Sequence, residues 1–423
     1  MSEWKEYRLG ELASVIPGFA FKGKDFGVNG CRVVKIGDIT PPIVDVTNCL
    51  RIPTEKINGL DKFKLQKGDF VLAMTGATLG KVGKYRSEET GYINQRVAKF
   101  ENIKGISDKH FLYYLITSNH VTNEIINRGL GSAQPNISGK DIETINVVAP
   151  DLPTQTAIAE ILSSLDDKIE LNNKINQELE NLAQTLFKQW FIDFEFPNEN
   201  GEPYKSSGGE MVDSELGEIP KGWSDSKLED ISNISIGRTP PRQEHHWFSE
   251  NPNDVMWISI KDMGNCGTFI LNTSEFLTEE AVSKFKIPII ASNTVIISFK
   301  LTVGRISITT ERMLSNEAIA HINLIDDSMS PEFIYLYLKQ FNFDSLGSTS
   351  SIATAVNSKA IKALKFIKPS QDVFQNFQLQ VFPVFQQILS YTKENQQLTN
   401  LRDTLLPKLI SGELEVSQIP TTS

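Results

Sequence analysis

The chain has 423 residues, of which 40% are hydrophobic, which is enough material for two globular domains with helical extensions. It contains no run of about 18 uninterrupted apolar residues, which argues against a membrane-spanning helix. Three widely separated cysteines, Cys31, Cys49 and Cys266, support neither a disulfide framework nor a zinc site. The formal net charge of −10 argues against tight binding of nucleic acid by the chain alone.

The acidic charge is concentrated in one part of the chain. Residues 1–150 hold 20 Lys and Arg against 16 Asp and Glu, whereas residues 151–216 hold 4 against 14. Because the repeated globular parts are not themselves strongly acidic, they can still face DNA if basic partners assist. The N-terminal residues carry no signal-peptide pattern, so we expect a cytoplasmic protein.

Residues 1–150 are predicted to form a first globular domain. Residues 33–36 and 69–74 are apolar runs bounded by Gly, Asp or Pro, as is typical of short strands. Residues 108–119 carry apolar side chains at helical spacing. Short strands with a separate helix indicate an α+β fold.

Residues 151–196 are predicted to contain a long helix that begins near Pro153 and ends near Phe191. About 37 residues at about 1.5 Å each would span about 55 Å, which is too long for one small domain to cover. A seven-residue repeat indicates a coiled-coil seam in which the polar Asn172 sets the register. The alternative is an amphipathic helix packed on its own domain. The seam positions are Ile158, Leu165, Asn172, Leu179 and Leu186, with Ile161, Lys168, Ile175, Leu182 and Gln189.

Residues 197–216 are a linker by composition, and residues 217–370 repeat the first domain. The period is far longer than that of a solenoid, so it indicates two duplicated domains related by pseudo-two-fold symmetry, a form suited to a bipartite ligand. The matched landmarks, at offsets of 219 to 224 residues, are Trp4 and Trp223, Asp38 and Asp262, Phe111 and Phe333, and Pro150 and Pro369.

Residues 371–414 are predicted to form a second long helix, packed antiparallel on the first. Pro383 and Pro407 predict a kink or a break there, and Gln380, which corresponds to Ile161, also departs from the apolar pattern. The proposed seam positions are Phe377, Val384, Tyr391, Leu398, Leu401 and Leu405.

The sequence does not support catalysis. Residues 18–25 match the P-loop spacing, but Asp25 stands where a nucleotide-bound magnesium ion needs Ser or Thr. Neither Pro-Pro pair has the neighbours that an adenine methyltransferase needs to hold a flipped base. His245 and His246 lack a Cys or carboxylate at ligand spacing, so they indicate loop residues or a DNA-facing role rather than a metal site.

Cations and amides recur in the turns of both repeats, where they could position phosphates or read base edges. Each of them taken singly is more often a solvated surface residue, and it is the recurrence that favours DNA binding. The candidates are Lys22, Lys24, Lys35, Lys81, Lys84, Arg96, Gln134 and Asn136 in the first repeat, and Arg238, Arg242, His245, His246, Lys261, Lys300, Arg305 and Asn357 in the second.

Three segments resemble the specificity subunit of type I restriction-modification systems. Residues 150–166 resemble its central conserved region, residues 215–223 the entry to its second target recognition domain, and residues 405–414 its C-terminal signature. The resemblance covers essentially the whole chain, although in the recognition domains it is one of architecture only.

The resemblance implies two target recognition domains, each reading one half of a split sequence in double-stranded DNA, with the helices setting the gap. It also implies partners. Two methyltransferase subunits would methylate adenine with S-adenosylmethionine, and restriction subunits would cleave DNA with ATP and magnesium. The chain itself is then expected to hold no cofactor and no metal, to catalyse nothing and to contact no membrane.

Other functions remain open from the residues alone. The chain could be the specificity part of a fused restriction-methylation enzyme, or a duplicated adaptor that joins two proteins without contacting DNA. A self-contained methyltransferase is the third alternative, which the missing motifs weaken.

Overall fold

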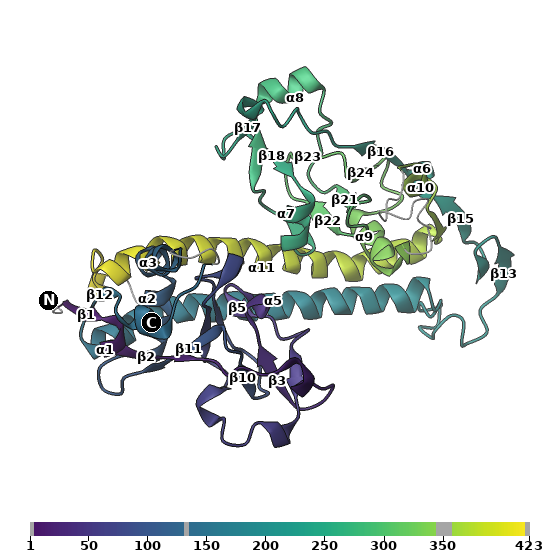
Figure 1. Ribbon diagram of the computed structural model, residues 1–423. Helices are drawn as coiled ribbons and strands as arrows, with labels where there is room; N and C mark the ends of the chain where they lie inside the picture. Colours follow the sequence, from purple (N-terminus) through teal and green to yellow (C-terminus); the bar gives the residue numbers. More distant parts are fainter. Residues whose placement is uncertain (1–3, 131–134, 344–357, 419–423) are drawn as a thin grey trace. The chain divides into compact units, whose positions relative to one another are not determined.

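The computed structural model describes residues 4–130, 135–343 and 358–418. The chain divides into two compact units. Unit 1 consists of Met1–Ile169 with Gln397–Ser423, and unit 2 consists of Glu170–Gln396. The division lies inside both long helices, so each unit combines one repeated globular part with a portion of each helix (Figure 1).

Unit 1 is built around a large sheet whose strands are β2 (Ala13–Pro17), β11 (Val97–Asn102), β8 (Phe70–Ala73), β9 (Val82–Lys84), β5 (Ile43–Val44) and β4 (Ile39–Thr40), in spatial order. A smaller sheet contains β6 (Leu50–Ile52), β3 (Cys31–Val34), β10 (Gly91–Ile93) and β7 (Lys64–Leu65). β1 (Lys5–Arg8) pairs with β12 (Asn146–Ala149). The short helices are α1 (Leu9–Leu12), α2 (Lys109–Thr117), α3 (Asn119–Gly129) and α4 (Gly139–Glu143).

Two cores form on the two faces of this large sheet. One core joins the sheet to α2 and to long-helix residues such as Leu162 and Leu409. The other joins it to the small sheet through Val34, Val71 and Ile93. Alternate residues of a strand point to opposite faces, so neighbours such as Val71 and Leu72 serve different cores.

Unit 2 has a large sheet of β16 (Ser232–Ile236), β24 (Ile319–Leu324), β21 (Val295–Ser298), β22 (Ile306–Thr309) and β19 (Phe269–Ile270), in spatial order. Its smaller sheet contains β17 (Phe248–Ser249), β20 (Glu275–Leu277), β18 (Val255–Ile258) and β23 (Leu314–Ser315). β15 (Ser224–Lys227) pairs with β25 (Lys365–Lys368), and β13 (Met211–Ser214), inside the predicted linker, pairs with β14 (Gly217–Pro220). The short helices are α6 (Leu228–Ile231), α7 (Ile260–Asn265), α8 (Glu279–Phe285), α9 (Pro331–Gln340) and α10 (Ser358–Lys362).

The strand pairing confirms the internal repeat. β11 lies between β2 and β8 in unit 1, as β24 lies between β16 and β21 in unit 2. In each small sheet one parallel pair adjoins an antiparallel pair. The matched helices also begin alike, since Asp108 caps α2 by accepting from the Phe111 amide and Ser330 caps α9 by accepting from that of Phe333. The α+β fold with two repeated domains is therefore confirmed.

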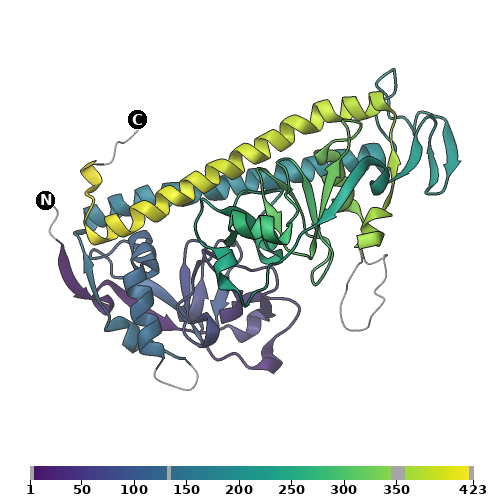
Figure 2. The same cartoon turned by 90° about the horizontal axis from the view of Figure 1, so that it is seen from above.

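The long helices are α5 (Leu152–Phe191) and α11 (Gln371–Ser411) (Figures 1 and 2). The break predicted at Pro383 and Pro407 does not occur, because α11 is continuous through both residues. Both prolines are exposed. The burial of Val381 and Phe385 on either side of Pro383 stabilises the helix enough to offset the hydrogen bond that proline removes.

Within unit 2 the two helices run antiparallel, since Asn172 contacts Asn395 while Asn176, further along α5, contacts Thr392. Some predicted seam positions point elsewhere. Leu182 is 48% exposed and Leu401 is 47% exposed. The neighbouring Ala183 is fully buried, because each helix packs against its globular part as well as against the other helix. The buried stripe is therefore wider than a coiled-coil seam and is displaced by one residue.

Of the other predicted seam positions, Gln189 is exposed and Lys168 is half-buried, and the rest are at least partly buried. Ile158, Asn172 and Phe377 are almost completely buried, while the half-buried members are Ile161, Leu165, Ile175, Leu179, Leu186, Val384, Tyr391, Leu398 and Leu405.

Candidate nucleic-acid interface

Three loops converge at one end of the large sheet in unit 2. They are the loop between β16 and η6 (His245–Trp247), the loop between β21 and β22, and the loop between β23 and β24. The Arg238 amide donates to the Ser315 carbonyl at 2.9 Å, and the Phe299 amide donates to the Ala318 carbonyl at 2.9 Å. These bonds fix the three loops against one another. We call the surface that they form recognition surface 2.

Recognition surface 2 carries several cations. Arg242 makes a two-pronged contact with Glu275, at 2.6 and 3.0 Å, and lies over the ring of Phe248. Lys300 and Arg238 are exposed. Partial burial acts to raise the pKa of Glu317, but a hydrogen bond from Thr239 and the cations nearby lower it overall. The surface therefore combines the exposed cations Arg238 and Lys300 with the carboxylates of Glu275 and Glu317, and the contact with Glu275 fixes the guanidinium of Arg242.

Unit 1 has the corresponding three loops, which we call recognition surface 1. The Gly18 amide donates to the Val97 carbonyl at 2.8 Å, and the Met74 amide donates to the Arg96 carbonyl at 2.9 Å. The loops here follow β2, β8 and β10, which match β16, β21 and β23. The same convergence therefore occurs in both repeats.

A glycine is required where the first loop leaves the sheet in each unit. A Cβ atom at Gly18 would lie 2.2 Å from the Asn94 carbonyl oxygen, and one at Gly237 would lie 2.1 Å from that of Ser315. Any side chain would separate the first loop from the third. These two glycines, 219 residues apart, keep the loops together in both units.

The structure places five first-repeat candidates on the exposed surface of unit 1, namely Lys22, Lys24, Lys81, Arg96 and Asn136. Gln134 lies outside the described residues. Lys35 is half-buried, with its ammonium 4.6 Å from the centroid of the Phe26 ring. A cation held over an aromatic ring is positioned rather than free.

Sequence reasoning overlooked an aromatic group on recognition surface 1. Phe19 is 38% exposed, and its ring centroid lies 5.0 Å from that of Phe21 and 5.5 Å from that of Phe63. The signal available was Phe19-Ala20-Phe21 next to Gly18, in a loop where apolar residues have no periodic role. Phe19 corresponds to Arg238 in unit 2, so the two surfaces differ chemically at this point.

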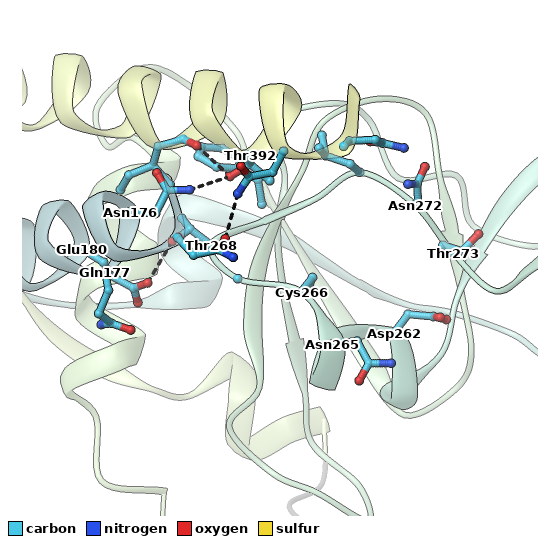
Figure 3. Close-up of a pocket in the computed structure, with 17 residues that line it drawn as sticks. Asn176, Gln177, Glu180, Asp262, Asn265, Cys266, Thr268, Asn272, Thr273 and Thr392 are labelled. Atoms are coloured by element: carbon cyan, nitrogen blue, oxygen red, sulfur yellow. Dashed lines mark hydrogen bonds between the residues drawn. The ribbon is translucent and has the colours of Figure 1, made fainter. Parts of the chain in front are cut away.

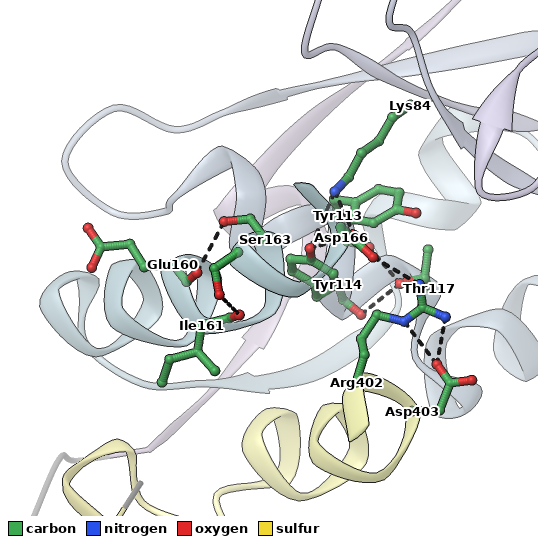
Figure 4. Close-up of polar contacts among 11 residues, drawn as sticks. Lys84, Tyr113, Tyr114, Thr117, Glu160, Ile161, Ser163, Asp166, Arg402 and Asp403 are labelled. Carbon is green, nitrogen blue, oxygen red and sulfur yellow. Dashed lines mark hydrogen bonds and ion pairs between the residues drawn. The ribbon is translucent and has the colours of Figure 1, made fainter. Parts of the chain in front are cut away.

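Lys84 was predicted to face DNA, and this is wrong. Its ammonium donates to Asp166 at 2.9 Å and to the Tyr114 hydroxyl at 3.3 Å, and its side chain is only 13% exposed (Figure 4). Arg402 of α11 donates to the other Asp166 oxygen at 2.9 Å. A cation that is buried and paired in this way cannot reach a phosphate, since leaving Asp166 would strand a buried charge.

The electrostatics of this cluster agree with a structural role. Burial acts to raise the pKa of the Asp166 carboxyl, yet the nearby cations and a tyrosine hydroxyl outweigh it and hold that pKa below its ordinary value. Burial lowers the pKa of Lys84 despite the neighbouring carboxylate, and burial together with Asp166 raises the pKa of Tyr114. The carboxylate at the centre of the cluster is therefore ionised.

In unit 2, Arg305 has a similar internal role, because its guanidinium donates to the Ile260 carbonyl and its backbone amide donates to the Ser298 hydroxyl. Lys261 in α7 and His245 and His246 in η6 are exposed, so the two histidines lie in a short 3-10 helix rather than in the predicted loop. Asn357 lies outside the described residues. Among the residues that the structure describes, no group of His, Cys, Asp and Glu could hold a metal ion, and no helix is long and apolar enough to cross a membrane.

Unit 2 also contains a cavity of about 500 Å³ between its helix segments and residues 262–273, with many amide and hydroxyl side chains in its lining (Figure 3). Amide side chains such as Asn176, Gln177 and Asn272 line it. The Oδ1 atoms of Asn172 and Asn176 are buried without a hydrogen-bond partner. Buried polar atoms of this kind are ordinarily satisfied by water.

Comparison with known proteins identifies the family. The family model for the type I restriction modification DNA specificity domain matches residues 1–181 and again residues 220–400. The specificity subunit of the type I restriction enzyme HindI from Haemophilus influenzae is 28% identical over 470 residues, covering 98% of this chain and 100% of that protein. The MjaIX specificity subunit from Methanocaldococcus jannaschii is 30% identical over 321 residues, covering 73% of this chain and 70% of its own.

The fold has a solved counterpart. The crystal structure of a type I restriction-modification S subunit from M. genitalium matches with a TM-score of 0.59 and 17% sequence identity, covering 100% of this chain and 97% of that one. With the double family match, this duplicated chain belongs to the type I restriction-modification DNA specificity subunits, non-catalytic proteins with two DNA recognition domains.

Proposed function

We propose that unit 1 and unit 2 each read one half of a bipartite sequence in double-stranded DNA, through recognition surfaces 1 and 2. The observation that carries this proposal is the convergence of three matched loops in both units, with exposed cations in each set. Cations at loop tips position phosphates, and side chains beside them contact bases. The two surfaces differ in chemistry at matched points, so we expect the two half-sites to differ in sequence.

We further propose that α5 and α11 set the spacer between the half-sites and bind two methyltransferase subunits. Each helix contributes residues to both units, as a spacer requires. Restriction subunits would join the same complex. The methyltransferase subunits would use S-adenosylmethionine, and the restriction subunits ATP and magnesium. The three unpaired cysteines agree with a cytoplasmic location.

Methylome sequencing of cells with and without this chain tests the proposal. The expected result is a bipartite methylated adenine motif that disappears when the chain is removed. An unchanged methylome would instead favour an adaptor that never contacts DNA. Exchanging residues 217–370 with those of a relative that has another motif should change one half of the motif and leave the other.

A second experiment tests the partners. Because the chain carries a net charge of −10, we expect it to bind DNA weakly alone and tightly with its methyltransferase subunits. A gel shift that shows nanomolar, sequence-specific binding by the chain alone would contradict this. Inserting matched residues into α5 and α11 should lengthen the spacer without altering either half-site.

A further inference from the structure

Leu301 lies at the tip of the loop between β21 and β22, on recognition surface 2. Its side chain is 77% exposed, and its φ angle is +63°, in the left-handed region. A non-glycine residue in this region is strained, because its Cβ atom crowds the carbonyl oxygen. The chain thus holds a large apolar side chain in solvent and in a strained conformation.

The fold does not need a leucine at this position, as unit 1 demonstrates. Gly76 and Leu301 each lie three residues after the matched strand ends, β8 and β21, and Gly76 has a φ angle of +69°. A glycine amide closes each loop, since Gly80 donates to the Ala73 carbonyl at 3.0 Å and Gly304 to that of Ser298 at 2.9 Å, although the unit 1 loop is one residue longer and contains the 3-10 turn η5 (Gly76–Thr78). Glycine makes this turn without strain.

Leu301 gains nothing from packing that would offset its strain, because most of its surface remains in water. The corresponding position in unit 1 is also open, since a Cβ atom built at Gly76 would meet nothing within 4 Å. Strain at an exposed position, without packing to explain it, indicates a functional constraint. The ligand must contact an apolar side chain that projects from the surface.

The neighbours of Leu301 show which ligand this is. Lys300, the residue before it, is exposed, and both Lys300 and Arg242 act on the nearby carboxylate of Glu317. The amide of Phe299 ties the same turn to the loop after β23. An apolar tip flanked by cations matches duplex DNA, in which charged phosphates border stacked bases.

We propose that Leu301 inserts between the bases of one step in the half-site that unit 2 reads, and so unstacks and bends the DNA there. Apolar wedges such as leucine unstack base steps in proteins that bend DNA. Lys300 would contact the adjoining phosphate. Unit 1 has Gly76 at the matched turn, so its half-site keeps its stacking there. The inference rests on DNA recognition by unit 2, and adds the residue that deforms the DNA and the half-site in which this happens.

Duplexes that contain the methylated motif of this chain, with 2-aminopurine placed at successive positions, test the proposal. The chain is used in complex with its methyltransferase subunits. We expect fluorescence to rise at one step of the unit 2 half-site, and Leu301→Gly and Leu301→Ala to abolish that rise and weaken binding about ten-fold. The matched control is Ile325→Ala, because Ile325 is 52% exposed at the other end of β24 and should leave the rise intact.

The Leu301→Gly variant also distinguishes a side chain that inserts between bases from one that only stabilises the fold. Glycine relieves the left-handed strain, so the midpoint of urea denaturation should stay the same or rise while the fluorescence signal is lost. A complex that keeps both the fluorescence rise and wild-type affinity after Leu301→Gly would overturn the wedge. A chain that specifies no motif at all would instead overturn the proposed function, so the two failures are distinguishable.

Discussion

The space between the large sheet and the long helices is filled by charged side chains in unit 1 and by apolar side chains in unit 2. In unit 1, Lys84 of β9, Asp166 of α5 and Arg402 of α11 form a buried cluster of charges. Lys84 pairs with Ile43 of the neighbouring strand β5, as Ile308 pairs with Phe269 of β19 in unit 2. The lysine position is thus occupied by an isoleucine in the second unit.

The helix residues differ in the same way. At the repeat offset of 219 residues, Asp166 corresponds to Phe385 and Arg402 to Ala183, both fully buried. The Phe385 ring centroid lies 5.6 Å from that of Tyr335 and 6.2 Å from that of Phe269. One backbone thus accepts either a complete set of paired charges or an aromatic cluster. A buried charge is tolerated only while every partner is present.

The largest expected effect comes from breaking the charged set. Asp166→Ala leaves the ammonium of Lys84, which is only 13% exposed, without its carboxylate, and removes one of the two carboxylates paired with Arg402, so the free energy of unfolding should fall by about 3–5 kcal/mol. Urea denaturation measures this. The matched control is Asp167→Ala, one residue along on the exposed face of α5, which should cost less than about 0.5 kcal/mol. A cost below about 1 kcal/mol for Asp166→Ala would contradict the interpretation of the cluster.

A conversion experiment sharpens the comparison. Placing the unit 2 residues in unit 1 as Lys84→Ile, Tyr114→Leu, Asp166→Phe and Arg402→Ala removes every member of the charged set together. Replacing a whole buried ionic group by apolar residues is often neutral or stabilising. We therefore expect the fourfold variant to be at least about 2 kcal/mol more stable than Asp166→Ala alone. A variant as unstable as the single substitution would imply that the two interiors are not interchangeable.

A third difference predicts a pH dependence of unit 2. His321 of β24 is fully buried between the hydroxyls of Ser235 and Ser315, and burial lowers its pKa to about 4. In the unfolded chain the imidazole of His321 has its ordinary pKa of about 6.5. Between pH 4 and pH 6.5 the unfolded chain therefore holds more protons than the folded chain. Stability is therefore complete above pH 6.5 and falls by about 3 kcal/mol as the pH drops to 4.

Urea denaturation between pH 7 and pH 4 measures this loss, and His321→Gln isolates it from other titrating groups. The variant should be less stable at pH 7, but its stability should depend less on pH over this range. Equal pH profiles for the two proteins would exclude His321 as the source. The position that corresponds to it in unit 1 is Lys99, which pairs with Glu101.

The smallest expected effect concerns phosphate contacts. Lys24→Ala in unit 1 and Lys300→Ala in unit 2 should each reduce the slope of log affinity against log salt by about 1, and should weaken binding similarly for all sequences. Titrations of the complex with its methyltransferase subunits at several salt concentrations measure this. A substitution that alters the methylated motif would show that the lysine reads bases instead.

Much of the fold could be predicted from the sequence because it depends on patterns repeated along the chain. The offset of Phe111 from Phe333 marked the two copies, and their matching caps and strand pairings agree with it. Pro153 marked the start of α5 to within a residue. These features are local in sequence, so propensity and periodicity suffice to indicate them.

The candidate site was only partly predictable. Exposed loop cations such as Lys24 and Arg96 lie where the turns suggested. Lys84 looked identical to them in sequence, but its partner Asp166 lies 82 residues away, and Arg402, which shares that carboxylate, lies 236 residues beyond Asp166. The exposure of Leu301 was equally hidden, because an apolar residue between two strands is ordinarily part of a core.

The sequence by itself determined the duplication, the two long helices and the membership of the specificity-subunit family. Each depends on residues that recur at fixed spacings or on motifs that are contiguous in the chain. Only the tertiary structure decided that Pro383 leaves α11 continuous, that Leu182 lies outside the buried stripe, and that Lys84 is internal whereas Leu301 is exposed. The physical reason is that burial and charge pairing depend on contacts between distant segments, and no local pattern specifies them.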